Sequence, residues 1–183
     1  FVDDDEQATQ FGVAAGGVGW QCWSWAAPRS DSHAGVMICV VQAFCTDASI
    51  RPHCAVPGRV ASLSLKHPDS HLAITCVYVP PGARVLEERC FAGLEETLLL
   101  CPKRSTWGVV GDFNAHVGTS RRPVVAEGTS VGPCQPEMED RRGRRLRSLA
   151  SMWGLKVLNT FVRAGPTYIG SNGAQSRIDY IIT

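Results

Sequence analysis

The sequence predicts a mixed α/β (α+β) fold in a single domain over residues 1–183, and three observations support this prediction. The chain has 183 residues, which is long enough to bury a sizeable core. Runs with strand character alternate with amphipathic helical segments, and two of the strands are joined by a short turn. No run of roughly eighteen apolar residues occurs, so we expect no membrane-spanning helix. Helices interleaved with strands, one hairpin among them, favour packed α/β layers over a purely parallel sheet.

Strand signals dominate the first half of the chain. Residues 35–41 (GVMICVV) form a continuous apolar run that predicts a buried strand. In residues 59–65, alanine and leucine alternate with serine, which predicts a half-buried strand. Residues 66–70 form a turn, and residues 72–79 return as a β-prone strand, so the two predict an antiparallel hairpin. Residues 7–34 carry no pattern that we assign to an element.

Two helices are predicted further along. In residues 85–100 the apolar positions recur every four residues, at Leu86, Cys90, Leu94 and Leu98, while glutamates occupy other positions. Residues 107–112 then form a strand, and the Gly- and Pro-rich residues 118–139 read as a loop. Asp140 is a suitable N-cap for a helix that reaches Trp153 and ends at Gly154. Residues 155–159 and 177–182 predict two more strands.

The net charge and the cysteine content exclude few classes of function. The net charge is +1, so bulk charge does not indicate a nucleic-acid partner. The eight cysteines include no CxxC pair, and we interpret them as buried free thiols, with Cys39 and Cys76 inside apolar segments. Cysteines of this kind favour a reducing compartment, and we expect a nuclear or cytoplasmic protein. The acidic start of the chain is not a signal peptide, and without an initiator methionine we expect a piece of a longer protein.

The segment with the strongest chemical signal is Gly111-Asp112-Phe113-Asn114-Ala115-His116, which follows an apolar strand. Side chains at positions i and i+2 of an extended segment lie on one face, so Asp112 and Asn114 are expected to reach into one pocket. A carboxylate that orients water beside a neutral amide that donates to phosphate suits phosphate chemistry. The alternative is that both are turn residues after a strand, because Asp and Asn favour turns.

Four motifs in order extend this signal. The GDFNAH segment and the SRIDYII segment at 176–182 resemble those of the endonuclease/exonuclease/phosphatase superfamily. The likeness is greatest to the apurinic-type endonuclease domains of non-LTR retrotransposon polyproteins. The VYVP segment at 77–80, and LNT at 158–160 followed by GPTY at 165–168, also match in order. The resemblance implies a two-sheet, four-layer α/β sandwich with its site at the strand ends along one edge.

The resemblance also implies roles for individual residues. Asp112 would orient or activate the attacking water, and Asn114 would hold the scissile phosphate. Tyr78 would donate its phenolic proton to a phosphate oxygen, and Thr167 would line the site. Asp179 resembles the carboxylate that hydrogen-bonds a catalytic histidine. The implied reaction is phosphodiester hydrolysis assisted by Mg²⁺ or Mn²⁺.

The chain departs from the family pattern at both ends. The first strand and the metal-binding glutamate of the family are expected upstream of residue 1, and the Ser-Asp-His of its last strand is expected after Thr183. No metal ligand is therefore assigned among these residues. Pro81 also stands where the family often has asparagine. We expect a fragment of the sandwich without its first and last strands, with weak or no activity.

Three weaker signals complete the reading. His116 is interpreted as a loop histidine whose ring can line the phosphate site. Arginines cluster at the start of the second predicted helix, where a solvated face is the default interpretation and a DNA-backbone contact through Arg144 and Arg145 is the alternative. Residues 128–132 match the GxSxG pattern of a nucleophile elbow, but Pro133 follows and the strand and helix that the elbow needs are not predicted.

The predicted function is nicking of DNA by a retrotransposon-like endonuclease, with DNA as partner and a reverse transcriptase domain covalently linked in the full-length protein. Two alternatives stay open. One is a phosphatase, or a phosphoinositide or phospholipid esterase, of the same superfamily. The other is a non-catalytic remnant or binding module that keeps only the fold.

Overall fold

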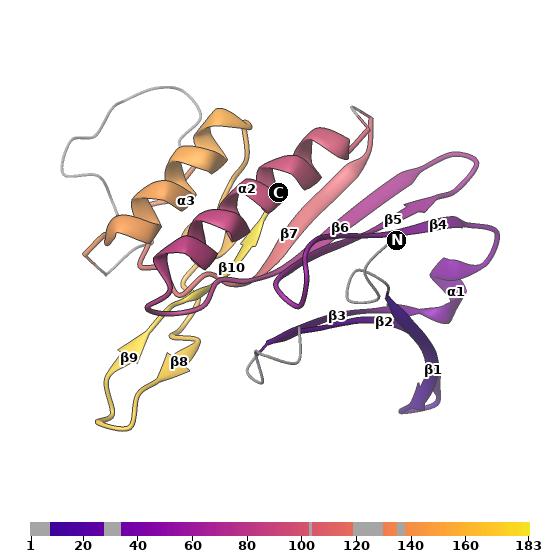
Figure 1. Ribbon diagram of the computed structural model, residues 1–183, viewed down its shortest axis with the longest axis horizontal. Helices are drawn as coiled ribbons and strands as arrows, with labels where there is room; N and C mark the ends of the chain where they lie inside the picture. The colour runs from indigo at the N-terminus through magenta and orange to yellow at the C-terminus, as the bar shows by residue number, and fades with distance from the viewer. Residues whose placement is uncertain (1–7, 28–33, 103, 119–129, 135–137) are drawn as a thin grey trace. The chain divides into compact units, whose positions relative to one another are not determined.

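The computed structural model describes residues 8–27, 34–102, 104–118, 130–134 and 138–183. The chain divides into two compact units, residues 1–108 and 109–183, and strand β7 crosses the boundary between them. Among the residues described, no helix is long and apolar enough to cross a membrane. Figure 1 labels the elements, which are mixed helices and strands, as the sequence predicts.

The first unit contains two antiparallel sheets and one long helix. One sheet has the order β1-β2-β3, and the strands β4, β5 and β6 pair in that order in the other. The elements are β1 (Thr9–Ala15), β2 (Val18–Ala26), β3 (Gly35–Val41), α1 (Gln42–Cys45), β4 (Ser49–Val56), β5 (Val60–Lys66), β6 (His71–Tyr78) and α2 (Arg84–Leu100).

The core of this unit lies between its two sheets. Trp23 and Trp25 of β2 and alternate residues of β3 pack against the inward face of β5, from which Leu63 and Leu65 are fully buried. Helix α2 contacts β4, β5 and β6. Strand β5 is therefore covered on both faces, and even Ser62 is buried. The prediction of a half-buried strand was wrong here because the serines face the helix side and not solvent.

Predictions for the neighbouring elements are confirmed with two further corrections. The hairpin of β5 and β6, strand β3 and helix α2 form where the pattern placed them. Strand β3 is buried on one face only, so Cys39 is exposed and is not the buried thiol that we predicted, although all eight cysteines are free. Glu87 is 0% exposed within α2, whereas the four-residue repeat placed it away from the core.

The second unit contains the end of β7 and the C-terminal elements. Strand β10 pairs antiparallel with β7, and a short hairpin, β8 with β9, precedes it. The elements are β7 (Thr106–Asp112), α3 (Arg141–Met152), the 3-10 helix η2 (Leu158–Thr160), β8 (Tyr168–Ile169), β9 (Gln175–Ser176) and β10 (Asp179–Ile182). Buried side chains of β7, α3 and β10, among them Val109, Leu146 and Ile182, form its core.

Helix α3 follows the prediction closely. Asp140 is its N-cap, and the Asp140 carboxylate accepts a hydrogen bond from the Gly143 backbone N–H at 2.6 Å. Gly154 adopts a left-handed φ of 67° just beyond the helix, as expected for a glycine at its C-terminal end. The strand predicted at 155–159 does not form. Val157 makes only isolated bridges, and the chain then turns into η2.

Candidate active site

Two carboxylates face each other at the end of the pair of strands β7 and β10. Asp112 is the last residue of β7, and the antiparallel register places it directly opposite Asp179, the first residue of β10. Like charges directly opposite on neighbouring strands destabilise a sheet. An acidic pair at this position therefore costs stability, which marks it as a candidate functional site.

Asn114 is bound to Asp112 through a turn. Its backbone N–H donates to Asp112 Oδ1 at 2.8 Å, and its side-chain Nδ2 donates to Asp112 Oδ2 at 3.2 Å. Asn114 has a φ of 44°, in the left-handed region that Asn tolerates better than most residues. The two side chains thus meet, as predicted, but the predicted reason was wrong. The chain leaves the extended conformation after Asp112, so strand alternation is not what brings them together.

The pKa of Asp112 is raised above its usual value. Partial burial is the largest cause, and the charge of Asp179 raises the pKa further. The two hydrogen bonds from Asn114 and the charge of Arg142 act in the opposite direction. A carboxylate with a raised pKa is a stronger base than an ordinary aspartate, which suits a group that takes a proton from water.

The loop after Asp112 is fixed by Tyr180, which is buried on β10. The Tyr180 hydroxyl accepts a hydrogen bond from the Val117 backbone N–H at 3.1 Å. It also lies 3.0 Å from the Ala115 carbonyl and 2.8 Å from the Arg177 carbonyl, which share its single proton. Phe113 packs near the same ring, with the ring centroids 6.3 Å apart. Asp112 and Asn114 therefore sit on a rigid support.

The first turn of α3 packs against the other side of this loop. The Asp140 backbone N–H donates to the His116 carbonyl at 3.1 Å, and Arg142 Nη1 donates to the Asn114 carbonyl at 2.9 Å. A side chain at Gly143 would place its Cβ 1.9 Å from the His116 carbonyl oxygen. Only glycine allows this approach. His116 was interpreted as a loop histidine, and its backbone carbonyl lies in the contact between this loop and α3, whereas a role of its ring toward phosphate stays a prediction.

Thr167 and Asn159 hold the backbone of Asp179. The Thr167 hydroxyl accepts hydrogen bonds from the backbone N–H groups of Ile178 (3.1 Å) and Asp179 (3.2 Å). The Asn159 side chain donates to the Asp179 carbonyl at 2.8 Å. Thr167 was predicted as a residue lining the site, whereas the roles of Asn159 and Arg177 were missed.

Arg177 organises the loops around this strand. It is 6% exposed, and its guanidinium donates to the backbone carbonyls of Cys134, Asn159, Ala164 and Gly165. These carbonyls come from three segments that are separate in the sequence. The available signal was an arginine next to the apolar residues of the SRIDYII segment, because an arginine is rarely buried unless its donors are satisfied.

Tyr78 belongs to the first unit, whereas Asp112, Asn114, Asp179 and Thr167 all belong to the second. It is the last residue of β6, and the Arg59 guanidinium carbon lies 4.5 Å from the centre of its ring. Its backbone N–H donates to the Arg59 carbonyl at 2.7 Å. The role of Tyr78 toward phosphate stays a prediction.

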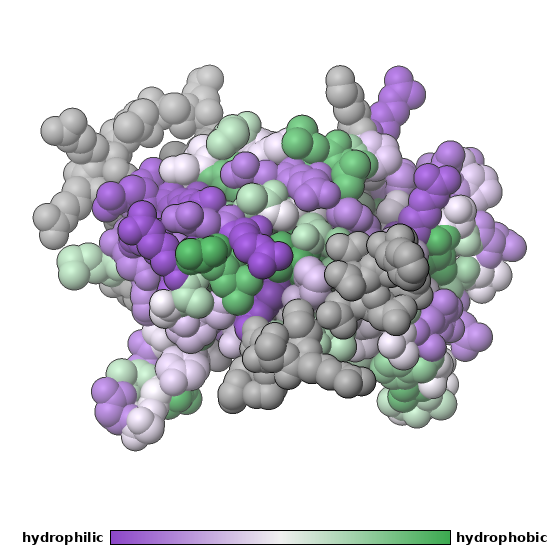
Figure 2. Space-filling view, in the orientation of Figure 1, coloured by the Kyte–Doolittle hydropathy of each residue, from purple (hydrophilic) through white to green (hydrophobic). Residues whose placement is uncertain are grey.

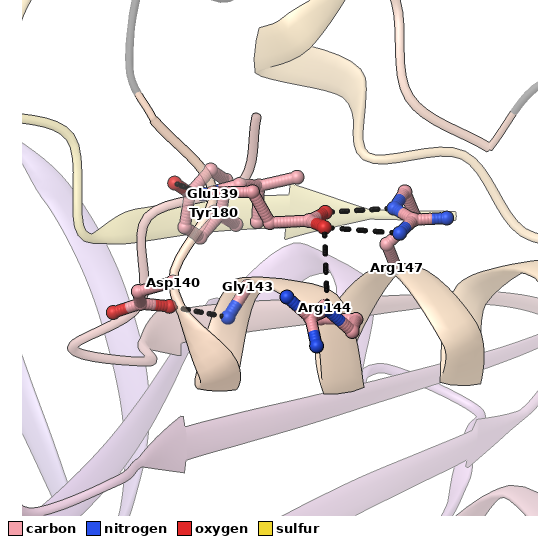
Figure 3. A network of polar contacts seen from close by, with 7 residues as sticks. Glu139, Asp140, Gly143, Arg144, Arg147 and Tyr180 are labelled. Carbon is pink, nitrogen blue, oxygen red and sulfur yellow. Dashed lines mark hydrogen bonds and ion pairs between the residues drawn. The ribbon is translucent and has the colours of Figure 1, made fainter. Parts of the chain in front are cut away.

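The arginines of α3 are tied together by Glu139, which lies just before the helix. The Arg147 guanidinium donates to both Glu139 carboxylate oxygens, at 2.7 and 3.0 Å, and Arg144 lies 3.8 Å from the same carboxylate (Figure 3). The Arg144 side chain is nevertheless 68% exposed. Figure 2 shows hydrophilic residues gathered over this helix. Arg145 is half-buried, so the outward charge of α3 comes mainly from Arg141 and Arg144.

The donor set available to a metal ion is small. Within the part of the chain that the structure describes, no group of three or more His, Cys, Asp or Glu side chains could hold a metal ion. Asp112 and Asp179 supply two carboxylates, and Mg²⁺ is commonly held by one or two carboxylates together with water and substrate phosphates. These residues therefore fit a Mg²⁺ site that is completed by substrate, and they do not fit a closed metal cage.

The described part of the GxSxG segment at residues 128–132 does not have the features of a nucleophile elbow. Gly128 and Thr129 lie outside the described residues. Val131 makes only an isolated bridge to Val157, and the Gly132 N–H donates to the Thr160 hydroxyl at 2.7 Å. Ser130 is buried, whereas a nucleophile must reach substrate.

Comparison with solved structures identifies the fold. The endonuclease domain of TRAS1, a telomere-specific non-LTR retrotransposon, aligns with a TM-score of 0.61 and 18% identity over 89% of this chain. The fold is of the endonuclease/exonuclease/phosphatase type. This type also includes the human Nocturnin catalytic domain (TM-score 0.46, 14% identity, 97% of this chain) and the Haemophilus ducreyi cytolethal distending toxin (0.35, 15%, 100%).

The chain spans less than two thirds of each of these structures, covering 64%, 60% and 66% of them respectively. No protein-family model and no curated protein sequence matches it. At 18% identity the comparison with TRAS1 establishes the endonuclease/exonuclease/phosphatase fold and leaves the activity to be argued from the site.

Proposed function

We propose that the chain is a phosphodiesterase of the nuclease kind, which hydrolyses the DNA backbone at the edge formed by β7 and β10. One observation carries this proposal. Asp112 and Asp179 are paired directly opposite each other on β7 and β10, and the Asn114 amide is held against the Asp112 carboxylate. The fold and the order of the sequence motifs support the same conclusion.

In the proposed reaction, Asp112 takes a proton from water as the water oxygen attacks phosphorus. One P–O ester bond breaks, and the leaving oxygen takes up a proton from solvent. Asn114 supplies a neutral amide donor for a phosphate oxygen, so that it stabilises developing negative charge without repelling the phosphate.

We propose that hydrolysis depends on Mg²⁺ or Mn²⁺, with Asp112 and Asp179 as the carboxylates that attract the ion. A divalent ion would neutralise charge on the phosphate. Because the described residues bring only these two carboxylates together at the site, we expect weak metal binding and a low rate. Removal of the ion with a chelator should stop the reaction.

The proposal predicts nicking of supercoiled plasmid DNA in the presence of Mg²⁺, measured as conversion to the relaxed circle. Asp112→Ala should slow nicking by about a hundredfold, the lower end of the range for loss of a general base. Asp69→Ala, which removes an exposed aspartate from the turn between β5 and β6, is the matched control and should nick at the wild-type rate. Equal rates for the wild type and Asp112→Ala would refute the assignment.

The same preparation distinguishes the alternatives. Hydrolysis of p-nitrophenyl phosphate that is lost in Asp112→Ala, without nicking, would replace the nuclease proposal with a phosphatase. Absence of both reactions, with and without Mn²⁺, would indicate a non-catalytic module that keeps only the fold.

We further propose that Arg144 and Arg145 contact the DNA backbone. Support comes from the exposure of Arg144 and from the hydrophilic surface over α3. Arg144→Ala combined with Arg145→Ala should reduce the slope of log Kobs against log salt concentration by about 1.8, because each phosphate contact contributes roughly 0.9. Fluorescence anisotropy with a labelled duplex measures this slope.

A matched double variant tests whether a change in the salt slope comes from the position of these arginines or from the net charge of the protein. Arg51→Ala combined with Lys66→Ala removes the same charge from exposed positions on β4 and β5. This variant should keep the wild-type slope. If both double variants change the slope equally, the contact is not specific to α3.

A further inference from the structure

The arginines at the start of α3 are unfavourable for the helix itself. The N-terminus of a helix carries partial positive charge, and Arg141 and Arg142 occupy its first two positions. The Asp140 cap offsets part of this cost through its hydrogen bond with the Gly143 N–H. A basic residue at this position therefore suggests a contact outside the helix that outweighs the electrostatic cost.

Arg142 makes such a contact. Its Nη1 donates to the Asn114 carbonyl at 2.9 Å, across 28 residues of sequence. Asn114 has the left-handed φ of 44°, a conformation that is unfavourable for residues other than glycine and is tolerated best by Asn and Asp. In this conformation the Asn114 N–H and side-chain amide face Asp112, while its carbonyl faces Arg142. The turn is thus held on one side by a carboxylate and on the other by a guanidinium.

We propose that Arg142 is a positioning residue, which holds the Asn114 turn so that the Asn114 amide stays against Asp112. The inference rests on the proposed phosphodiesterase function for its catalytic consequence, and it does not require Arg142 to touch DNA. Arg142 acts on Asn114 through the Asn114 backbone carbonyl. Its positive charge also lowers the pKa of Asp112, as the hydrogen bonds from Asn114 do.

Helix α3 is well placed to carry this residue. The Asp140 N–H donates to the His116 carbonyl, and Gly143 lies directly against the same carbonyl. These two backbone contacts fix the first turn of α3 to the loop on either side of Arg142. The backbone of Arg142 is therefore held close to the loop, within reach of the Asn114 carbonyl that its guanidinium contacts.

The experiment compares Arg142→Met, Arg142→Lys and Arg141→Met. Amide hydrogen exchange at Asn114, followed by NMR, reports the turn directly. Loss of a hydrogen bond from a charged donor should speed this exchange by about tenfold or more in Arg142→Met. Arg142→Lys should show a smaller effect. Arg141→Met removes an exposed arginine from the same turn of the helix and should leave the exchange at Asn114 unchanged.

Nicking kinetics provide the second measurement. Arg142→Met should lower kcat by about tenfold with KM for DNA unchanged, and Arg142→Lys should recover part of kcat. A raised KM with unchanged kcat, and a reduced salt slope, would instead show a phosphate contact and overturn the positioning role. Unchanged exchange at Asn114 would overturn it as well.

The two readouts keep this inference separate from the proposed function. If the wild type shows no nicking, the nuclease proposal fails, and exchange at Asn114 alone decides whether Arg142 holds the turn. If Arg142→Met does not fold, the same comparison is made between Arg142→Lys and Arg141→Met, where faster exchange at Asn114 in the lysine variant supports the inference and equal exchange refutes it.

Discussion

Replacing Arg177 with methionine is expected to lower the free energy of unfolding by about 3 kcal/mol. The guanidinium is buried, its four acceptor residues are half-buried or exposed, and a hydrogen bond from a charged donor contributes about 1.5–3 kcal/mol, part of which water recovers at the exposed acceptors. Methionine fills much of the same volume but donates no hydrogen bond. The carbonyls of Cys134, Asn159, Ala164 and Gly165 would all lose the guanidinium. Urea denaturation followed by circular dichroism measures the change.

Two further variants sharpen this prediction. Arg163→Met removes an exposed arginine from the same region and should change stability by less than about 0.5 kcal/mol. Arg177→Lys keeps the charge, but its single ammonium group cannot reproduce the planar fork of donors. Its loss of unfolding free energy should therefore lie between the losses of Arg177→Met and Arg163→Met. Equal stability of Arg177→Met and Arg163→Met would contradict the arrangement described.

The loss of Arg177 should also affect the position of Asp179 in the candidate site. One of its acceptors is the carbonyl of Asn159, whose side chain donates to the Asp179 carbonyl. Two others, at Ala164 and Gly165, lie shortly before Thr167, whose hydroxyl accepts from the Asp179 N–H. We therefore expect faster amide exchange at Asp179 in Arg177→Met. The position of Asp179 opposite Asp112 depends in this way on Arg177, which acts through the backbone carbonyls of the neighbouring loops.

Much of the fold could be predicted because hydrophobic periodicity is a local property. The pattern located β3, β5, β6, β7, α2 and α3. It missed the hairpin of β1 and β2 although a signal was present. Gly16 and Gly17 adopt φ values of 59° and 75°, which a two-residue hairpin turn requires. Strand β4 was missed because Pro52 interrupts it, and a proline weakens any strand prediction.

The errors in burial have a different origin. Periodicity shows that a strand has two faces but does not show what covers each of them. The serines of β5 face the side that α2 occupies, and Glu87 of α2 is fully buried. The packing of a helix on a sheet is decided by contacts between residues that are far apart in the sequence. The exposure of Cys39 and the burial of Glu87 therefore could not be predicted from their sequence neighbours.

The candidate site was predicted in part. Asp112, Asn114 and Asp179 were chosen from their sequence motifs, and the structure brings all three together. The residues that were missed act through contacts between distant segments. Arg142 reaches Asn114 from a helix, and Asn159 reaches Asp179 from a 3-10 helix where we expected a strand. No local pattern contains this information.

Gly143→Ala is the second large expected effect, and its sign is opposite to that of helix propensity. Alanine is favoured over glycine within a helix by about 1 kcal/mol, so propensity alone predicts that the variant is more stable. The added Cβ would lie 1.9 Å from the His116 carbonyl oxygen and 2.5 Å from its carbon, where only backbone is present to move. We expect a loss of about 3 kcal/mol, in the range of severe overpacking.

Relief of this clash requires α3 and the loop at 113–117 to separate, which would pull Arg142 away from the Asn114 carbonyl. Gly143→Ala should therefore speed amide exchange at Asn114 as Arg142→Met does, although it leaves every charge in place. Gly165→Ala is the matched control, because nothing lies within 4 Å of its added Cβ. It should unfold as the wild type does. If Gly143→Ala were as stable as the wild type, α3 would not be seated on the His116 carbonyl, and the support proposed for Asn114 would be lost with that contact.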